Sequence, residues 1–231
     1  MNKVAILSPE NSRIVKKFSD CGFEIINTQC VSEFISYEQY HADIQCLIID
    51  DNAFVLKCCD YLTKQLSKYK NVILCGENIN KKYPYNIALN ACVIGKNLIG
   101  NLKYIDEKVI NFCKYKGYNF INVKQGYTAC SCLKIGDRAL ITADLSIYKA
   151  LKSTDIEVLL IEQGSINLKG ANYGFIGGAS GVYKDKIYFF GDLATHKNYN
   201  EISKFILDHR FQIVNMVENQ ELIDIGGALF C

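Results

Sequence analysis

The chain has 231 residues, 49% of them hydrophobic, and a formal net charge of +2 at pH 7. This length allows a sizeable core in one or two domains, and the nearly balanced charge excludes nucleic acid or a membrane surface as a partner held by bulk charge. The apolar runs are shorter than the ~20 residues of a transmembrane helix, and the segment before Pro9 lacks the apolar core of a signal peptide. We therefore expect a cytoplasmic protein.

The cysteine pattern also indicates a reducing compartment. There are 11 cysteines, an odd number, and many lie inside apolar runs, as do Cys46, Cys75, Cys92 and Cys113. Such thiols are typical of a cytosolic protein without a disulfide framework. The pairs Cys58-Cys59 and Cys130-x-Cys132 have no second pair or histidine at metal-ligand spacing, so we predict small buried residues there, no metal site and no cofactor.

The first part of the chain alternates strand-sized apolar runs with helical patterns. Strands are expected at residues 3–7, 23–26, 45–50 and 71–75. A helix should begin at residues 8–10 and end at Cys21-Gly22. An amphipathic pattern predicts a second helix over residues 54–69, whereas residues 29–41 have no clear period and residues 78–85 are predicted to form a loop.

Three further rounds of strand, turn, strand, helix and strand follow. Their first strands are expected at residues 87–94, at residues 129–135 and from Gly177 to a turn at 184–186. Their second strands are expected at residues 98–99, 139–142 and 187–190. Helices at residues 105–116 and 146–152 and around Ile202 to Ile206 lead to third strands at 119–123, 156–161 and 211–214.

The last two rounds align closely, which indicates an internal repeat. Ser131 matches Ser180 and Asp144 matches Asp192, so the period is about 48 residues. The final segment from Gly226 resembles the first strand of another round, and the N-terminal segment supplies the rest of that round. We therefore expect a ring that closes by pairing of the terminal strands, which covers edge strands. The predicted single domain, 1–231, has repeats at 225–231 plus 1–28, 29–77, 86–124, 127–163 and 175–217.

Five strand-strand-helix-strand repeats around a pseudo-five-fold axis resemble the pentein fold of the guanidino-group-modifying enzymes (GME), an α/β propeller. The residues that carry the resemblance are CLKIGDRALITADL (132–145), GVYKDKIYFFGDL (181–193) and IDIGGALFC (223–231). The likeness spans essentially the whole chain. It implies membership of that superfamily, in one of its less characterised bacterial branches.

The resemblance implies cysteine chemistry near the end of the chain. Enzymes of this fold use a cysteine thiolate on a guanidinium carbon, a histidine that moves protons, and two acidic side chains that grip the planar cation. Their cysteine follows a Gly-Gly pair, as Cys231 follows Gly226-Gly227 here. Alternatively, Cys231 is a small apolar residue of the closing strand, beside a terminal carboxylate that would disfavour a thiolate.

The histidine departs from the family pattern. In the enzymes it opens a first strand about nine residues before the inter-strand turn, and this count gives Thr128 in the fourth round and isoleucine or glycine in the fifth. His196, four residues after Asp192, is therefore the candidate for a proton-transferring pair. The alternative is an exposed histidine near a helix start. His41 and His209 lie in the irregular second round and near a helix end.

Carboxylates at strand ends are the candidates for gripping a guanidinium group. They are Asp50, Asp51, Asp144 and Glu162, in addition to Asp192. An aspartate between a strand and a helix can instead cap the helix by accepting from free backbone N–H groups. Both interpretations stay open for these residues.

Three functional interpretations follow. The first is a cysteine-dependent amidine or guanidine hydrolase or amidinotransferase that acts on a guanidino or amino-acid-like small molecule through Cys231, His196 and Asp192. The second is a non-catalytic pentein binding module, like the translation initiation factors of this fold. The absence of histidine from its position in the enzymes favours this interpretation. The third is an ordinary α/β domain that binds a small molecule at the Asp50-Asp51 strand end.

Overall fold

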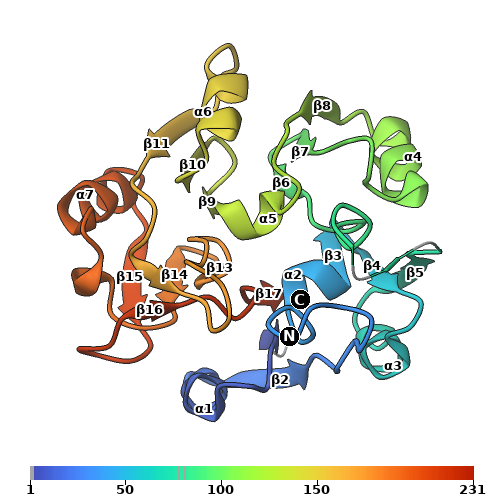
Figure 1. The fold of residues 1–231 in the computed structure, drawn as a ribbon, viewed down its shortest axis with the longest axis horizontal. Helices are drawn as coiled ribbons and strands as arrows, with labels where there is room; N and C mark the ends of the chain where they lie inside the picture. Colours follow the sequence, from blue (N-terminus) through green and yellow to red (C-terminus); the bar gives the residue numbers. More distant parts are fainter. Residues whose placement is uncertain (1–2, 78, 81) are drawn as a thin grey trace.

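The computed structural model describes residues 3–77, 79–80 and 82–231, and its main feature is a ring of five three-stranded sheets (Figure 1). In every sheet the first two strands are antiparallel and the third is parallel to the second. An outer helix connects the two parallel strands. Each sheet with its helix is one blade, so the structure confirms the five-repeat pentein ring expected from the sequence.

The blades use the following strands. The first blade has β17 (Leu229–Phe230), β1 (Lys3–Leu7) and β2 (Phe23–Asn27). The second and third have β3 (Cys46–Ile49), β4 (Asn52–Leu56) and β5 (Asn71–Cys75), then β6 (Cys92–Ile94), β7 (Asn97–Gly100) and β8 (Asn119–Asn122). The fourth and fifth have β9 (Cys132–Ile135), β10 (Ala139–Thr142) and β11 (Glu157–Leu160), then β13 (Ser180–Tyr183), β14 (Lys186–Phe189) and β15 (Gln212–Asn215).

The helices fall into an outer and an inner set. The outer helices are α1 (Ser12–Asp20), α3 (Asp60–Leu66), α4 (Glu107–Tyr115), α6 (Leu145–Leu151) and α7 (Tyr199–Asp208). The short inner helices are α2 (Ala42–Gln45) and α5 (Thr128–Ser131). A 3-10 turn, η1 (Leu193–Thr195), precedes α7, and β12 (Ile166–Asn167) pairs with β16 (Leu222–Ile223) outside the blades. Within the described ranges, every helix is too short or too polar to span a bilayer.

The two ends of the chain complete one blade, as predicted. Ala5 lies opposite Phe230 and Ile6 opposite Leu229 in the antiparallel β1–β17 pair. A bridge between Gly181 and Ala228 then connects this blade to the fifth. Ring closure therefore depends on the two-residue strand β17, which belongs to the first blade and lies against the fifth.

Burial follows the position of each strand in its blade. All four residues of β10 are buried, whereas the third strand beside it, β11, is partly exposed. The second strands are covered on both sides, so they have continuous apolar sequences, and the third strands form the outer edges. The hydrophobic core is therefore a set of clusters between adjacent blades rather than one central cluster.

Several of the expected elements were wrong in extent. The helix expected at residues 54–69 starts only at Asp60, because residues 53–56 are an unbroken buried apolar run that forms strand β4. The strand expected at 129–135 begins at Cys132, after helix α5, and the one expected at 87–94 begins at Cys92. Helix α1 begins after Asn11, whose side chain accepts from the Ile14 N–H, rather than at residues 8–10. The loop expected at 78–85 includes two residues outside the described ranges.

Candidate functional site

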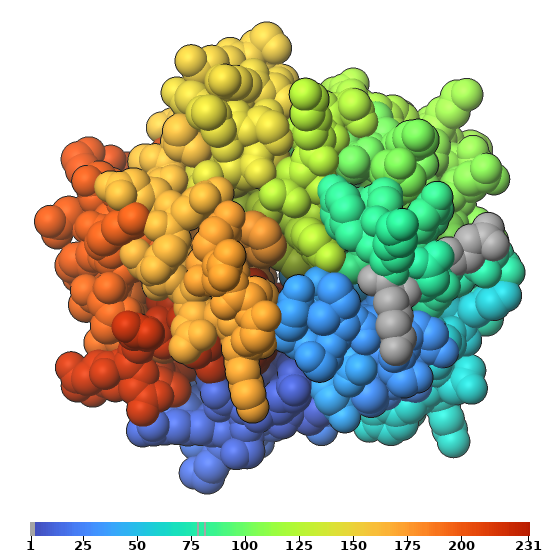
Figure 2. Space-filling view, in the orientation of Figure 1, coloured from blue at the N-terminus to red at the C-terminus, as the bar shows by residue number. Residues whose placement is uncertain are grey.

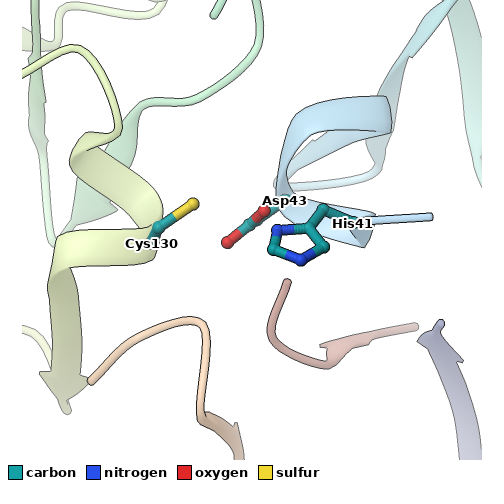
Figure 3. Close-up of side chains that lie close together, drawn as sticks. All are labelled: His41, Asp43 and Cys130. Atoms are coloured by element: carbon teal, nitrogen blue, oxygen red, sulfur yellow. The ribbon is translucent and has the colours of Figure 1, made fainter. Parts of the chain in front are cut away.

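The axis of the ring brings together three chemically different side chains. His41 and Asp43 come from the start of α2, and Cys130 comes from α5 (Figure 3). One donor atom of each residue lies within 4.8 Å of the others, and all three residues are buried. The Asp43 carboxylate lies between the imidazole and the thiol. An imidazole, a carboxylate and a thiol therefore share one small space.

Asn90, which is fully buried, fixes this arrangement from the third repeat. Its side-chain Nδ2 donates to Cys130 Sγ at 3.1 Å and to the main-chain oxygen of Asp43 at 3.0 Å. Its Oδ1 accepts from the Ala129 N–H at 2.8 Å, at the start of α5. One amide therefore holds both inner helices in position, because it satisfies groups on each of them.

A further carboxylate, Asp224, follows β16 and is also buried. Its oxygens accept from the N–H groups of Phe175 at 2.9 Å and Gly226 at 3.0 Å. A Cβ on Gly178 would lie 2.1 Å from Asp224 Oδ1, and a Cβ on Gly226, whose φ is +82°, would lie 2.4 Å from the Cα of His41. These glycines therefore make room for the carboxylate and the histidine.

A cavity of about 260 Å³ opens beside the cluster. His41, Cys130, Asp224 and Glu38 supply its polar wall, and aromatic rings supply much of the rest; they belong to Tyr37, Tyr127, Tyr173 and Phe175. The segments that form it meet around the centre of the face in Figure 2. Among the described residues that line it, none is lysine or arginine. Asp43 lines a second cavity, so the cluster separates two hollows of the ring.

The electrostatics of the cluster follow from burial beside carboxylates. Burial raises the pKa of Asp43 to about 6, with His41 opposing this shift and Asp224 adding to it. Burial, followed by the charges of Asp43 and Asp224, raises the pKa of the Cys130 thiol well above its ordinary value. These surroundings favour the neutral thiol of Cys130, whereas a cation bound beside it would favour the ionised form.

A family model matches residues 6–229 and carries the description "Family of unknown function (DUF6873)". The chain belongs to this family. No curated protein matches it by sequence. The match covers all five blades, so the DUF6873 assignment applies to the whole ring rather than to one repeat.

Solved structures show the same architecture at low identity. A dimethylarginine dimethylaminohydrolase (DDAH) variant, an adduct with S-methyl-L-thiocitrulline, is 8% identical with a TM-score of 0.61. A DDAH variant from Pseudomonas aeruginosa, complexed with citrulline, is 9% identical with a TM-score of 0.59, and both comparisons cover 100% of each chain. SxtG, an amidinotransferase from Microseira wollei, is 9% identical with a TM-score of 0.53 over 93% of this chain and 88% of its own. This DUF6873 protein therefore has the pentein fold.

The residues that the sequence suggested as catalytic lie outside the axial cavity. Asp192 accepts from the Ala194 N–H and caps η1, and the ring Nδ1 of buried His196 accepts from the Asn198 N–H. Cys231 is partly exposed at the end of the first blade, and burial raises the pKa of its thiol. Within the described ranges, no hydrogen bond or ion pair joins Cys231 to Asp192 or His196.

The four other suggested carboxylates have local partners. Asp50 accepts from the Tyr118 hydroxyl at 3.3 Å, and Asp51 forms an ion pair with Lys70 at 3.6 Å. Asp144 caps α6 by accepting from the backbone N–H groups of its first turn, at 2.8 and 3.0 Å. Glu162 forms an ion pair with Lys197 at 2.9 Å. None of the four lines the axial cavity, and the capping alternative describes Asp144 and Asp192 in the structure.

The sequence nevertheless contained a signal for His41. The inter-strand turn of the second blade lies at Asp50 and Asp51, between β3 and β4, and nine residues before it stands His41. This match is not recognisable from the irregular pattern of residues 29–41, because no predicted helix or strand there can be aligned with the first strands of the other repeats. Cys130 and Asp224 had no comparable signal, since their proximity depends on ring closure.

Proposed function

We propose that the axial cavity binds a small guanidino or amidino compound, and that this DUF6873 protein hydrolyses it or transfers its amidino group. The observation that carries the proposal is the composition of the cavity wall. Two buried carboxylates, Glu38 and Asp224, an imidazole and a thiol line it, with no lysine or arginine among its described lining residues. Paired carboxylates bind a planar cation through several charge-assisted hydrogen bonds.

The aromatic wall supports a planar cation as the ligand. Tyr127 and Phe175 stack with a centroid distance of 6.3 Å and an interplanar angle of 27°, and Tyr173 meets Phe175 edge-on at 6.1 Å. Cations are attracted to aromatic faces, and this attraction grows when water is excluded. The structures of similar fold include a dimethylarginine dimethylaminohydrolase and an amidinotransferase, which also supports a guanidino ligand.

The proposed reaction assigns one role to each polar side chain. The Cys130 thiol gives its proton to His41 as Sγ bonds to the guanidinium carbon, and the C–N bond to the leaving amine then breaks as His41 passes that proton to the leaving nitrogen. Water, or an acceptor amine in a transferase, then displaces the sulfur and regenerates the thiol. Asp224 and Glu38 hold the planar cation throughout. Hydrolysis gives a ureido product and an amine or ammonia.

Binding is tested first, with ligands that differ only in charge. Arginine and agmatine should raise the melting temperature, whereas citrulline, the uncharged counterpart of arginine, should raise it less. Asp224→Asn should weaken guanidino binding about 10-fold or more, since a charge-assisted hydrogen bond contributes about 1.5–3 kcal/mol. Asp192→Asn is the matched control on a carboxylate outside the cavity. Equal shifts with arginine and citrulline would rule out a cation site.

Turnover is tested with two cysteine variants. Cys130→Ser should abolish release of ammonia or amine while binding persists, and Cys231→Ser should retain activity. The reverse pattern would return the reaction to the terminal cysteine suggested by the sequence. Binding of guanidino compounds by the wild type without any turnover would instead assign the chain to the non-catalytic pentein binding modules.

We also propose that the protein acts in the cytoplasm. All 11 cysteines are free thiols, and most of them are buried. A reducing compartment preserves such thiols, including the one at the axis.

A further inference from the structure

We propose that His41, Asp43 and Cys130 form a binding site for one divalent zinc-class metal ion at the axis of the ring. The three residues supply nitrogen, oxygen and sulfur donors from two segments that are far apart in the sequence. Their donor atoms all lie within 4.8 Å of one another. Tetrahedral zinc, with bonds of about 2.0–2.3 Å, places its ligand atoms about 3.3–3.8 Å apart, so small side-chain rotations would complete the site.

The Asp43 carboxylate gives an independent reason to expect a cation. Only 5% of this residue is exposed, and in the described part of the chain the Cys130 thiol is the one group that donates to its oxygens. An ionised carboxylate buried with a single neutral donor is costly, since desolvation of an ion costs several kcal/mol. Figure 3 shows this carboxylate lying between the thiol of Cys130 and the imidazole of His41. A cation at that point would contact all three groups.

The donor set selects the class of metal. Magnesium and calcium prefer oxygen ligands only, whereas zinc and similar ions bind thiolate and imidazole together with carboxylate. Three protein ligands leave one position for water or a substrate atom, as in zinc sites that are not closed. Because the cluster separates two cavities, that position is reachable from a hollow of the ring.

Residues around the cluster are arranged as an outer layer of a metal site. Asn90 donates to the sulfur of Cys130, which stabilises a thiolate, and holds the start of α5 through the Ala129 N–H. Gly226 allows the backbone to pass against His41, where any Cβ would collide. The spacing of the cysteine pairs along the sequence predicts no metal site. The donors His41, Asp43 and Cys130 are far apart in the sequence and meet only in the folded ring.

A metal ion here would also regulate the proposed reaction. It would occupy the sulfur and the imidazole that the reaction needs, so metal and guanidino substrate would exclude each other. This consequence rests on the proposed function, whereas the metal site itself does not.

Cobalt is the probe that reports the ligands directly. Reduced, metal-free protein titrated with Co²⁺ should bind one equivalent and develop the near-ultraviolet band of sulfur-to-cobalt charge transfer. Zn²⁺ should displace the cobalt and remove the band. One equivalent of Zn²⁺ should also protect Cys130 from alkylation in the wild type, as read by peptide mass spectrometry. Absence of the band, or unchanged alkylation of Cys130, would overturn the proposal without any variant.

Variants then locate the ion. Cys130→Ser and Asp43→Asn should each weaken zinc binding at least about 10-fold, because loss even of an outer-layer partner has effects of that size. The matched control is Cys132→Ser, which removes another buried thiol two residues along the chain. Cys132 hydrogen-bonds with Cys92, so these two thiols are the competing site. Loss of zinc in Cys132→Ser with retention in Cys130→Ser would refute the assignment.

The two proposals fail separately. Arginine binding is measured on the metal-free protein by thermal shift, and metal binding is measured without arginine. A cobalt band without an arginine shift would leave the metal site and remove the guanidino function. An arginine shift without a cobalt band would do the opposite.

Discussion

Replacement of Phe230 by alanine should reveal how strongly the last strand closes the ring. Phe230 lies on β17, and its ring contacts two aromatic residues of the first blade, Phe18 at 6.1 Å and Phe23 at 5.4 Å between centroids. It also contacts two of the fifth blade, Tyr183 at 5.3 Å and Tyr188 at 6.4 Å. The side chain therefore joins blades formed by opposite ends of the chain.

The expected loss of stability is about 3 kcal/mol. Truncation of a fully buried phenylalanine costs about 3–5 kcal/mol, and Phe230 is only partly buried, which places it near the lower end. Each aromatic pair adds about 0.5–1.5 kcal/mol beyond burial, which offsets part of that reduction. In a chain of this length, 3 kcal/mol corresponds to a fall in melting temperature of about 6–12 °C.

The assay compares Phe230→Ala with Phe120→Ala. Phe120 lies on the outer strand β8 and is 36% exposed, so its truncation should cost less than about 1 kcal/mol. Thermal melting and urea unfolding give the two costs, and hydrogen exchange shows where protection falls. We expect losses in β1 and β14 but not in β7. Equal costs for the two variants, or losses confined to β17, would refute the reasoning that this strand joins the first and fifth blades.

Three further substitutions test local features. Asp144→Ala removes the cap of α6 and should lower the free energy of unfolding by about 1 kcal/mol, as measured in urea. Burial opposes ionisation of the Asp144 carboxyl, but its hydrogen bonds hold its pKa below the ordinary value. The loss of stability should therefore be constant above pH ~4 and shrink below it, and a loss that grew in acid would contradict this. Gly178→Ala should displace the Asp224 carboxylate and weaken arginine binding about 10-fold by calorimetry, whereas Gly100→Ala, whose Cβ comes no closer than 3.4 Å to any neighbour, should not. Asn90→Ala should lower the free energy of unfolding by about 1–3 kcal/mol, since it leaves buried groups unpaired; an unchanged urea midpoint would show that this amide does not hold the inner helices.

The repeat and its closure could be predicted because they depend on local patterns. Apolar runs such as residues 3–7 and 139–142 are strands in the structure, since a fully buried strand needs no other signal. The pairing of Ala5 with Phe230 followed from counting units, because a ring of incomplete end units leaves open edges unless they pair. Where local signals competed, as at residues 54–56, tertiary burial decided in favour of a strand.

The axial site depended on the tertiary structure. Asp144 and Asp192 stand at matching positions of two repeats, yet both cap helices of their own repeats, because their side chains accept from backbone N–H groups two or three residues along the chain. His41 comes from the second round, Cys130 from the fourth and Asp224 from the segment after the fifth, and they meet only where the inner ends of the blades converge. Sequence periodicity determines how each unit packs against the next. The distances between side chains of different blades depend on all five of these contacts together, so they are defined only in the closed ring.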